Sequence, residues 1–278
     1  MRVLFFPCTL DGLAKHSGSR LIRCEWVAKY WEEAEVYDGT QRLRDFQLFV
    51  FQKAYLGHTS QKLIRQLARW RDEGRPIALA FDLCDPDFLG PHYLRVLMEL
   101  LPLFDFATAP TTPLVEWLAQ WLPAYEIPDG VDTEAITVHH EFRETRNPSI
   151  VWMGYKGNAG ALLEISQTMQ DEGLTGDTVT VSSPMPFEAF VAQMAEYDIL
   201  LNPRPPRPPF LYKSDNKTLV AWAAGVAVAC DGPELRQLLL PKFRREHLAL
   251  GRGYVERGGH VRESVMAWQD VVRQEMEL

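Results

Sequence analysis

Residues 196–231 read EYDILLNPRPPRPPFLYKSDNKTLVAWAAGVAVACD, and this stretch decides the fold. Two short apolar runs, Asp198–Leu201 and Ala227–Cys230, have the length and composition of buried strands. Between them, Asp215–Ala224 has the composition of a helix, whereas the prolines of Asn202–Ser214 exclude a helix or a central strand. A strand, a helix and a second strand in this order are typical of a βαβ unit with parallel strands.

The same alternation of apolar runs and amphipathic stretches covers the rest of the chain, and it predicts an α/β fold. Further strands are predicted at Val3–Phe6, Glu35–Tyr37, Leu48–Phe51, Pro76–Phe81, Phe104–Thr108, Tyr125–Ile127, Ser149–Met153, Thr178–Ser182 and Gly253–Val255. Further helices are predicted at Ser60–Asp72, Thr112–Trp121, Ala159–Glu172, Pro186–Glu196 and Val261–Met276.

A polar stretch divides the chain into two parts of similar size. His139–Pro148, HHEFRETRNP, is charged and ends in proline, which is typical of a linker. Residues 1–138 and 149–260 each have the size of one Rossmann-like domain, and we expect a ligand in the cleft between them. Residues 261–278 are predicted to form a C-terminal helix that packs back toward the N-terminal domain. Its apolar stripe consists of Val261, Val265, Trp268, Val271 and Val272.

The composition argues against several classes of protein. No apolar run reaches the roughly 18–20 residues of a membrane span, and the start, MRVLFFPCTLDG, lacks the pattern of a signal peptide. The net charge of −8 argues against a broad nucleic-acid-binding surface, although a modified base stays open as a substrate. The cysteines show no metal-ligand spacing, and free thiols are typical of the cytoplasm. They are Cys8, Cys24, Cys84 and Cys230.

Three strand-to-helix loops have residues suited to binding a phosphate group. In parallel sheets, ligands bind at the carboxyl ends of strands, where helix N-termini attract anions. The loop Thr9–Arg20 contributes Ser17, Gly18 and Arg20, and it leads into a helix expected to continue through Ala28. The glycine turn contributes Gly154, Tyr155, Lys156, Gly157 and Asn158, and the start of the third helix contributes Lys213, Ser214, Asn216 and Lys217. An ordinary tight turn with a solvated lysine is the alternative.

Lys217 is the most informative of these residues. The dipole of a helix disfavours a cation in the first turn, so a lysine there needs another reason. A bound diphosphate would supply that reason, because Ser214 or Asp215 can cap the helix while Lys213 and Lys217 add positive charge.

Carboxylates follow the strand predicted at Pro76–Phe81. Asp82 and Asp85 in DLCDPD are placed for acid–base work or for binding sugar hydroxyls, and Asp87 fits a helix cap. His16 is a further candidate base, with a surface or capping histidine as the alternative. A divalent ion between Asp82 and Asp85 is a second alternative, but no histidine or further acid joins them, and no metal site is predicted.

Several of these stretches, in this order, resemble the GT-B glycosyltransferases, particularly the large retaining family, glycosyltransferase family 4. Ile127–Asp132, IPDGVD, resembles the family's IPNGVD, and Ile150–Asn158, IVWMGYKGN, resembles the start of its second domain. Glu196–Pro203 and Leu219–Asp231 resemble ADILLLPS and LEAMAAGVPVVAS. The resemblance implies two Rossmann-like domains, the first on the acceptor side and the second binding the nucleotide sugar.

The resemblance also implies a reaction. A hexose-like sugar would pass from a nucleoside diphosphate such as UDP to an acceptor hydroxyl, with retention of configuration and without a metal or other cofactor. The family's paired glutamates are replaced here by Tyr212 and Val220, and a subset of similar proteins carries the pattern of Lys213, Ser214 and Lys217 instead. A sugar-nucleotide epimerase of similar architecture and an inactive binding protein stay open as alternatives.

Overall fold

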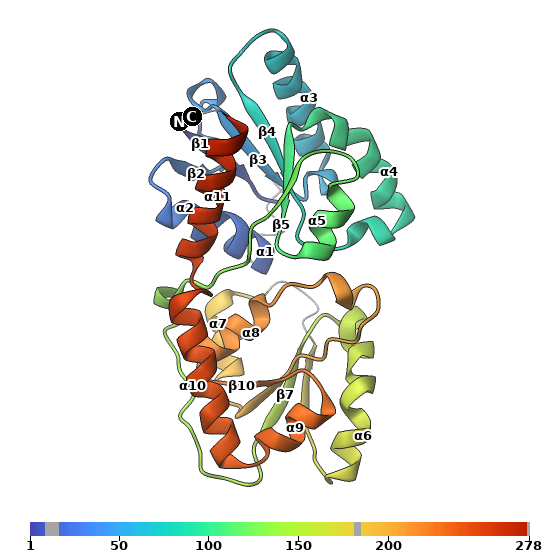
Figure 1. Cartoon of the computed structure of the whole chain (residues 1–278), viewed down its shortest axis with the longest axis vertical. Helices are drawn as coiled ribbons and strands as arrows, with labels where there is room; N and C mark the ends of the chain where they lie inside the picture. The colour runs from blue at the N-terminus through green and yellow to red at the C-terminus, as the bar shows by residue number, and fades with distance from the viewer. Residues whose placement is uncertain (9–16, 181–184, 277–278) are drawn as a thin grey trace. The chain divides into compact units, whose positions relative to one another are not determined.

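The computed structural model describes residues 1–8, 17–180 and 185–276 (Figure 1). Contacts within the chain divide it into two compact units. Unit 1 consists of Met1–Asp129, Tyr212–Ser214 and Val261–Leu278, and unit 2 consists of Gly130–Leu211 and Asp215–His260. Residues 139–148, predicted as a linker, lie inside unit 2, and the chain first passes from one unit to the other between Asp129 and Gly130.

Unit 1 contains a parallel sheet whose described strands have the order β2-β1-β3-β4-β5-β6. They are β1 (Val3–Phe6), β2 (Ala34–Val36), β3 (Leu48–Gln52), β4 (Ala78–Asp82), β5 (Phe106–Ala109) and β6 (Ala124–Glu126). The runs VLFF in β1 and LFVFQ in β3 are buried throughout, as expected of parallel strands with helices on both faces. Because β2 and β3 flank β1, the strand order reverses at β1.

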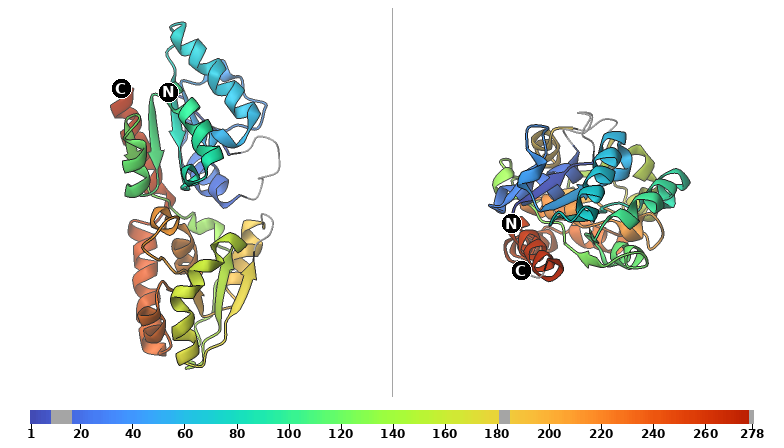
Figure 2. Two further views of the ribbon diagram at one scale, coloured as in Figure 1. Left: turned by 90° about the vertical axis from the view of Figure 1, so that its right-hand side faces the viewer. Right: turned by 90° about the horizontal axis from the view of Figure 1, so that it is seen from above.

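Helices cover both faces of this sheet. They are α1 (Gly18–Arg20), a π-helical turn at Leu21–Glu25, α2 (Trp26–Tyr30), α3 (His58–Asp72), α4 (Pro91–Leu100), α5 (Thr112–Leu118) and α11 (Val261–Glu275). The ring of Phe6 stacks on Phe51 at 4.4 Å between centroids, whereas Phe5 contacts Trp268 of α11 edge to face at 5.6 Å. In the side view of Figure 2, α3 and α11 lie on opposite faces of the sheet.

Unit 2 contains a second parallel sheet, whose described strands have the order β10-β9-β7-β8. They are β7 (Ile150–Gly154), β8 (Asp177–Thr180), β9 (Ile199–Leu201) and β10 (Ala227–Ala229). The helices are α6 (Leu163–Asp171), α7 (Phe187–Met194), α8 (Asn216–Ala223), α9 (Gly232–Leu238) and α10 (Pro241–Arg257). Apolar side chains of β7, β9 and β10 pack with those of α6, α9 and α10 to form the core. The predicted α/β class with parallel sheets is confirmed.

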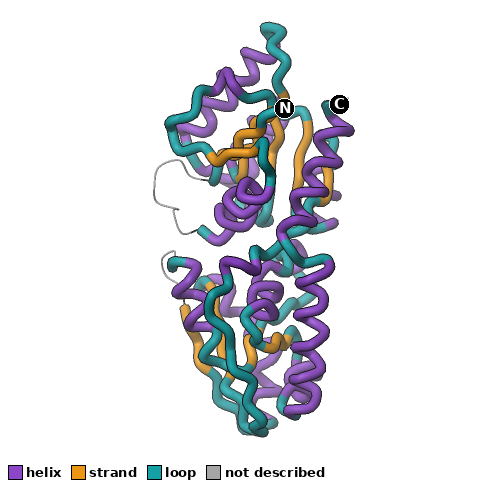
Figure 3. Tube along the Cα trace, turned by 90° about the vertical axis from the view of Figure 1, so that its left-hand side faces the viewer, coloured by secondary structure: helices purple, strands orange, loops and turns teal. Residues whose placement is uncertain are grey.

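One prediction of secondary structure is wrong, and one predicted helix begins in another helical form. Gly253–Val255 does not form a strand but lies in α10, the long helix of unit 2 in Figure 3. The run GYV is too short to reveal the helical recurrence of buried residues at Arg244, Leu248, Gly251 and Val255. The helix predicted at Ala159–Glu172 begins as a 3-10 helix at Lys156–Leu162 and becomes α-helical only at Leu163. Among the described residues, no helix combines the length and apolar character needed to cross a membrane.

Candidate functional site

The turn after β7 lies where the strand order of unit 2 reverses, because β8 and β9 flank β7 on opposite sides. In open parallel sheets, ligands bind outside the carboxyl ends of the strands at such a point. A Cβ atom on Gly154 would lie 2.9 Å from the ring of Trp152, so any other residue requires that ring to move. Tyr155, Lys156 and Gly157 are exposed, and Asn158 is half-buried.

Helix α8 begins beside this turn. Lys217, the second residue of α8, donates from Nζ to the carbonyl oxygen of Met153 at 2.8 Å and lies 5.9 Å from the ring centroid of Trp152. Asn202, which follows β9, donates from Nδ2 to Oγ1 of Thr218 at 3.0 Å. The structure therefore brings the glycine turn together with Asn216 and Lys217, which begin α8, at the carboxyl ends of two neighbouring strands.

Asp215 occupies the position before the first residue of α8. Its side chain makes no hydrogen bond to the backbone N–H groups of the helix, and it pairs instead with Arg204 at 3.2 Å. The Asp215 carboxylate therefore does not compete with an external anion for the N–H groups of the first turn. At the other end of α8, Gly225 has a φ of +79°, the left-handed conformation in which glycine commonly terminates a helix.

Lys213 and Ser214 make their hydrogen bonds within unit 1. Nζ of Lys213 pairs with Oδ1 of Asp85, and Ser214 donates to the side chain of Asp129. Tyr212 places its ring edge to face against Phe88, with 5.3 Å between centroids. Lys213 and Lys217 are predicted to bind one diphosphate together; the ion pair of Lys213 with Asp85 lies in unit 1, and the hydrogen bond of Lys217 to Met153 lies in unit 2.

Asp85 is held by two lysines. Its Oδ2 pairs with Nζ of Lys53, and its Oδ1 pairs with Lys213. Lys53 lies 3.3 Å from Asp87 as well, and Tyr55 donates its hydroxyl to Asp87. Burial raises the pKa of Asp85, but the two lysines outweigh this effect, and the pKa of Asp85 is lower than usual. The side chain of Asp85 is 27% exposed, so it is the accessible carboxylate of the two predicted to be catalytic.

The backbone of Lys53 has an unusual conformation. Its φ of 47° and ψ of 41° are left-handed values, which a residue other than glycine rarely adopts. Burial lowers the pKa of Lys53, but its electrostatic interactions with Cys84 and with the carboxylate of Asp85 outweigh burial and raise the pKa well above its usual value. Backbone strain of this kind persists where the surroundings hold a side chain in place, and it often accompanies function.

Asp82 is buried and fully occupied. Its exposure is 1%, and its two oxygens accept hydrogen bonds from Nη2 and Nε of Arg23 at 2.5 and 3.1 Å and from Oγ1 of Thr108 at 2.7 Å. Nη1 of Arg23 also bonds to the carbonyl oxygen of Ile127 at 2.5 Å and to Asp129 at 3.0 Å. Asp82 thus holds the guanidinium of Arg23 in place, and its predicted acid–base role stays a prediction.

Arg23 and Asp129 are both buried, which perturbs the pKa of each. Burial lowers the pKa of Arg23, but the charges of Asp82 and Asp129 outweigh it, and the pKa is raised above its usual value. Burial raises the pKa of Asp129, although Arg23 and Ser214 act in the opposite direction. The guanidinium therefore stays charged and holds together the ends of β4 and of the chain segment that leaves unit 1.

The remaining predicted residues lie near the start of the first helix of unit 1. Ser17 precedes α1 and shares a hydrogen bond of 2.9 Å with Ser19, Gly18 is exposed, and Arg20 pairs with Glu25 at 2.6 Å. His16 lies outside the described residues, so its predicted role as a base stays a prediction. Within the described residues, no three His, Cys, Asp or Glu side chains are grouped so that they could hold a metal ion.

The sequence reasoning missed Arg23, Lys53 and Asp129. Arg23 lies in the π-helical turn, which carries its guanidinium into the interior, and no residue pattern marks such a turn. Lys53 directly follows β3, so its position at a strand end was the available signal. Asp129 belongs to the IPDGVD stretch, which drew attention for its likeness to a motif rather than for its charge.

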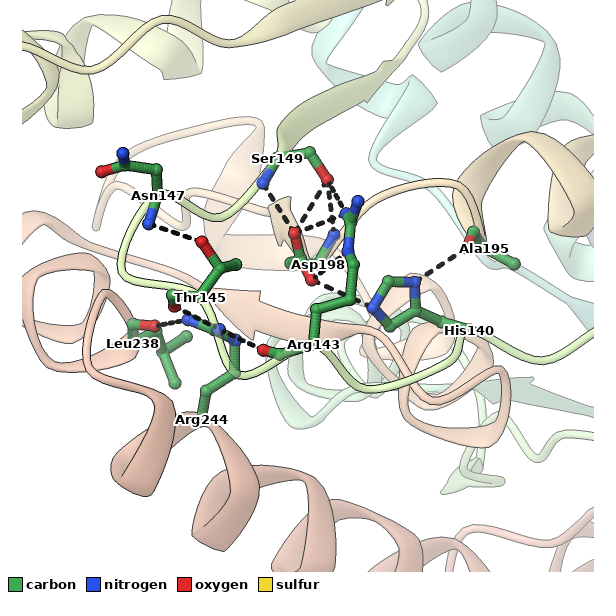
Figure 4. Close-up of polar contacts among 9 residues, drawn as sticks. All are labelled: His140, Arg143, Thr145, Asn147, Ser149, Ala195, Asp198, Leu238 and Arg244. Atoms are coloured by element: carbon green, nitrogen blue, oxygen red, sulfur yellow. Dashed lines mark hydrogen bonds and ion pairs between the residues drawn. The ribbon is translucent and has the colours of Figure 1, made fainter.

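A second network of polar groups stabilises unit 2 at the opposite ends of its strands (Figure 4). Asp198 precedes β9 and accepts hydrogen bonds from Nη2 of Arg143 at 2.6 Å and from the backbone N–H of Ser149 at 2.7 Å. Nε2 of His140 lies 3.1 Å from the same carboxylate. Because this network lies at the amino ends of β7 and β9, away from the ligand-binding edge, we assign it a structural role.

Comparisons with known proteins find similar solved structures but no matching family model or curated protein. The chain is similar to a crystal structure of the GtfA/B complex, with a TM-score of 0.47 and 10% sequence identity over 84% of this chain and 59% of that chain. It is also similar to a crystal structure of Anabaena HepE in complex with UDP-glucose, with a TM-score of 0.44 and 14% identity over 99% and 95% of the two chains. The chain thus spans less than two thirds of the chain that it matches in the GtfA/B complex.

Proposed function

We propose that the chain is a GT-B glycosyltransferase, which transfers a sugar from a nucleoside-diphosphate sugar such as a UDP-sugar to an acceptor hydroxyl. The observation that carries this proposal is the contact between Lys217 and the carbonyl oxygen of Met153. It places a lysine, the start of α8 and an exposed glycine turn together where the strand order of unit 2 reverses. The resemblance of the sequence to the retaining GT-B family supports the same reading.

Unit 2 would bind the donor. During transfer, the bond between the anomeric carbon and the diphosphate oxygen breaks, and negative charge grows on the diphosphate. The N–H groups and dipole of α8, the ammonium group of Lys217 and the turn Gly154–Asn158 would stabilise that charge. Lys156, which is exposed in the turn, adds a second cation beside Lys217. In this proposal the lysines and the helix do the work that a divalent metal does elsewhere.

Unit 1 would supply the acceptor side. The acceptor oxygen forms the new bond to the anomeric carbon, and its proton passes to a base or to the leaving diphosphate. Among the described residues we propose Asp85 for contact with the acceptor, because its side chain is 27% exposed, whereas Asp82 is 1% exposed and occupied by Arg23. Asp82 would act through Arg23, by fixing the end of β4.

A protein that binds a nucleotide sugar without transferring it is the second candidate. Two positions favour it, because the family's paired glutamates are absent there. Val220 is 3% exposed and packs inside unit 2, and the ring of Tyr212 packs on Phe88 in unit 1. Neither side chain can bind the ribose or the donor sugar as a carboxylate would.

Ligand binding and turnover separate these proposals. Thermal unfolding would be measured with UDP, GDP, ADP, TDP and CMP, and the bound nucleotide should stabilise the protein by about 2.7 kcal/mol at a hundredfold excess over its dissociation constant. The rate at which the nucleoside diphosphate is released from the matching nucleotide sugar is then measured with and without EDTA. This release reports transfer of the sugar or its hydrolysis. Nucleotide binding without turnover would support the binding protein. Conversion of the free nucleotide sugar into its epimer would identify an epimerase, and absence of any nucleotide binding would refute the proposal.

A further inference from the structure

Helix α10 carries the most exposed large apolar side chain among the described residues. Leu250 is 74% exposed, and Phe243 and Tyr254 on the same helix are 42% and 54% exposed. In Figure 1, α10 lies at the edge of unit 2 and runs along its full height. The face of α10 that packs on the unit consists of Arg244, Leu248, Gly251 and Val255.

The exposed residues form one stripe along α10. An α-helix turns by about 100° and rises by about 1.5 Å per residue, so Phe243 and Tyr254 lie within about 40° of Leu250 around the helix axis. The same calculation places Glu246 and Arg257 within about 40° of Leu250 on the other side. Both charged residues are exposed. Phe243, Leu250 and Tyr254 thus form an apolar stripe, and Glu246 and Arg257 lie along one side of it, one toward each end. Such a surface can bind another helix.

We propose that two copies of this chain associate through α10, with the two helices antiparallel and Leu250 at the two-fold axis. In such an interface each residue pair occurs twice, because the same surface contributes from both copies. The two-fold operation brings Tyr254 within about 4.5 Å of Phe243 of the second copy, measured along the helix axis, and it brings Arg257 within the same axial distance of Glu246 of the second copy. A parallel arrangement would instead place Glu246 beside Glu246 and Arg257 beside Arg257, which like-charge repulsion disfavours.

The size of the stripe indicates a weak dimer. A stable interface between proteins buries about 1,200–2,000 Å² in total, and a single pair of helices of this length provides less. We therefore expect a concentration-dependent equilibrium between monomer and dimer rather than a permanent dimer. The proposal is independent of the function proposed above, because it involves none of the residues assigned to the donor or the acceptor.

Sedimentation equilibrium of the full chain, from about 1 µM to about 1 mM, measures the association constant directly. We expect Leu250→Glu to weaken dimerisation by about tenfold or more, because it places two carboxylates at the two-fold axis. Leu163→Glu is the matched control: Leu163 is 72% exposed on α6, and its substitution should leave the association constant unchanged. Circular dichroism and thermal unfolding show that each variant is folded.

Charge reversal tests the antiparallel register. Glu246→Arg alone and Arg257→Glu alone should each weaken the dimer, since either change opposes two like charges across the interface. The double variant should restore association, because the pair is formed again with its signs exchanged. A wild-type chain that is monomeric over the whole concentration range would overturn the proposal. So would an equal loss with Leu163→Glu, or a double variant that is no better than the single ones.

Discussion

Lys213 and Asp85 form an ion pair across 128 residues of sequence. Lys213 directly precedes the region in which α8 begins, yet it belongs to the compact unit that contains the first sheet, as do Tyr212 and Ser214. The chain on either side of this segment belongs to unit 2. Lys213 was predicted to bind a diphosphate, but in the structure it pairs with the carboxylate of Asp85. The same carboxylate also pairs with Lys53.

Replacing Asp85 by Asn should destabilise the protein by about 1.5–3 kcal/mol, the usual range for hydrogen bonds to charged groups. The loss arises because, among the described residues, Lys53 keeps Asp87 as its carboxylate partner and Lys213 loses the Asp85 carboxylate. Urea unfolding measures the change. Asp45→Asn serves as the control, because Asp45 pairs with Arg42, whose side chain is 78% exposed, and such a change should stay within about 0.5 kcal/mol. Equal effects of the two substitutions would show that the two lysines do not depend on Asp85.

The buried pair of Arg23 and Asp82 should matter more. Arg23→Ala leaves Asp82 and Asp129 without their cation in the interior, and breaking a buried pair in this way costs about 3–5 kcal/mol. Chemical denaturation should show a loss of that size, whereas Arg42→Ala at the surface should change little. A loss below about 1 kcal/mol would mean that water reaches these carboxylates and that the network is not closed.

The sequence predicted the strands better than the helices. The runs VLFF and LFVF are apolar throughout, and a short continuous apolar run is typical of a strand that is buried on both faces. No separate range was predicted for helix α4, which Pro91 begins and in which only Leu97 and Leu100 are buried. The start of α11 and its buried stripe, from Val261 to Val272, agree with the predicted pattern because valines and Trp268 recur at helical spacing.

The glycine turn and Lys217 of unit 2 and Asp85 of unit 1 were predicted from the sequence, whereas Arg23 and Lys53 of unit 1 were not. The glycine turn directly follows β7, and Lys217 lies in the first turn of α8. A parallel sheet brings the ends of its strands and the starts of the following helices to one edge of the sheet. Arg23 and Asp82 are 59 residues apart, and nothing in the local sequence states that a π-helical turn would bury that arginine. The same holds for Lys213, whose carboxylate partner depends on how a proline-rich segment runs in three dimensions.

Asp198 should make the protein sensitive to acid. Burial raises its pKa, but hydrogen bonds from His140, Arg143 and Ser149 outweigh burial, and the pKa in the folded state lies well below the usual value. A carboxylate with a lowered pKa stabilises the folded state fully above its unfolded pKa of about 3.9, and this stabilisation is lost as the pH falls further. The free energy of unfolding of the wild type should therefore decline below about pH 4.

The variant Asp198→Asn isolates that contribution. It should be less stable than the wild type at neutral pH, because Arg143 and His140 lose their anion. The difference between the two proteins should shrink as the pH falls below about 4, since Asp198 of the unfolded wild type then takes up a proton while the folded-state carboxylate stays ionised. Urea unfolding at a series of pH values measures both curves. A difference that stays constant with pH would contradict the assigned cause.

Gly154 should tolerate no side chain. An added Cβ atom would lie 2.9 Å from the Trp152 ring, which is 3% exposed and packed in the core of unit 2. Gly154→Ala should therefore cost about 1–3 kcal/mol of stability, as overpacking of a core usually does. Gly157→Ala in the same turn is the control, because its added Cβ would meet no described atom within 4 Å. Thermal unfolding of both variants distinguishes a packing requirement from a general intolerance of the turn.

Lys217 gives the sharpest test of the proposed donor site. Its ammonium group already lies 2.8 Å from the carbonyl oxygen of Met153, so a ligand at the turn would add an anion to a side chain that is held in place. Lys217→Ala should weaken binding of a nucleoside diphosphate by about 1.5–3 kcal/mol, the range for a charge-assisted hydrogen bond. Lys242→Ala on α10 removes the same charge from a side chain that is 79% exposed and should leave the affinity unchanged. Isothermal titration of both variants with the nucleotide that binds the wild type measures the difference.

Because the hydrogen bond of Lys217 to Met153 is also lost in Lys217→Ala, circular dichroism and urea unfolding must show that the variant remains folded. Equal affinities of wild type and Lys217→Ala would mean that this lysine fixes the end of β7 and does not bind the donor.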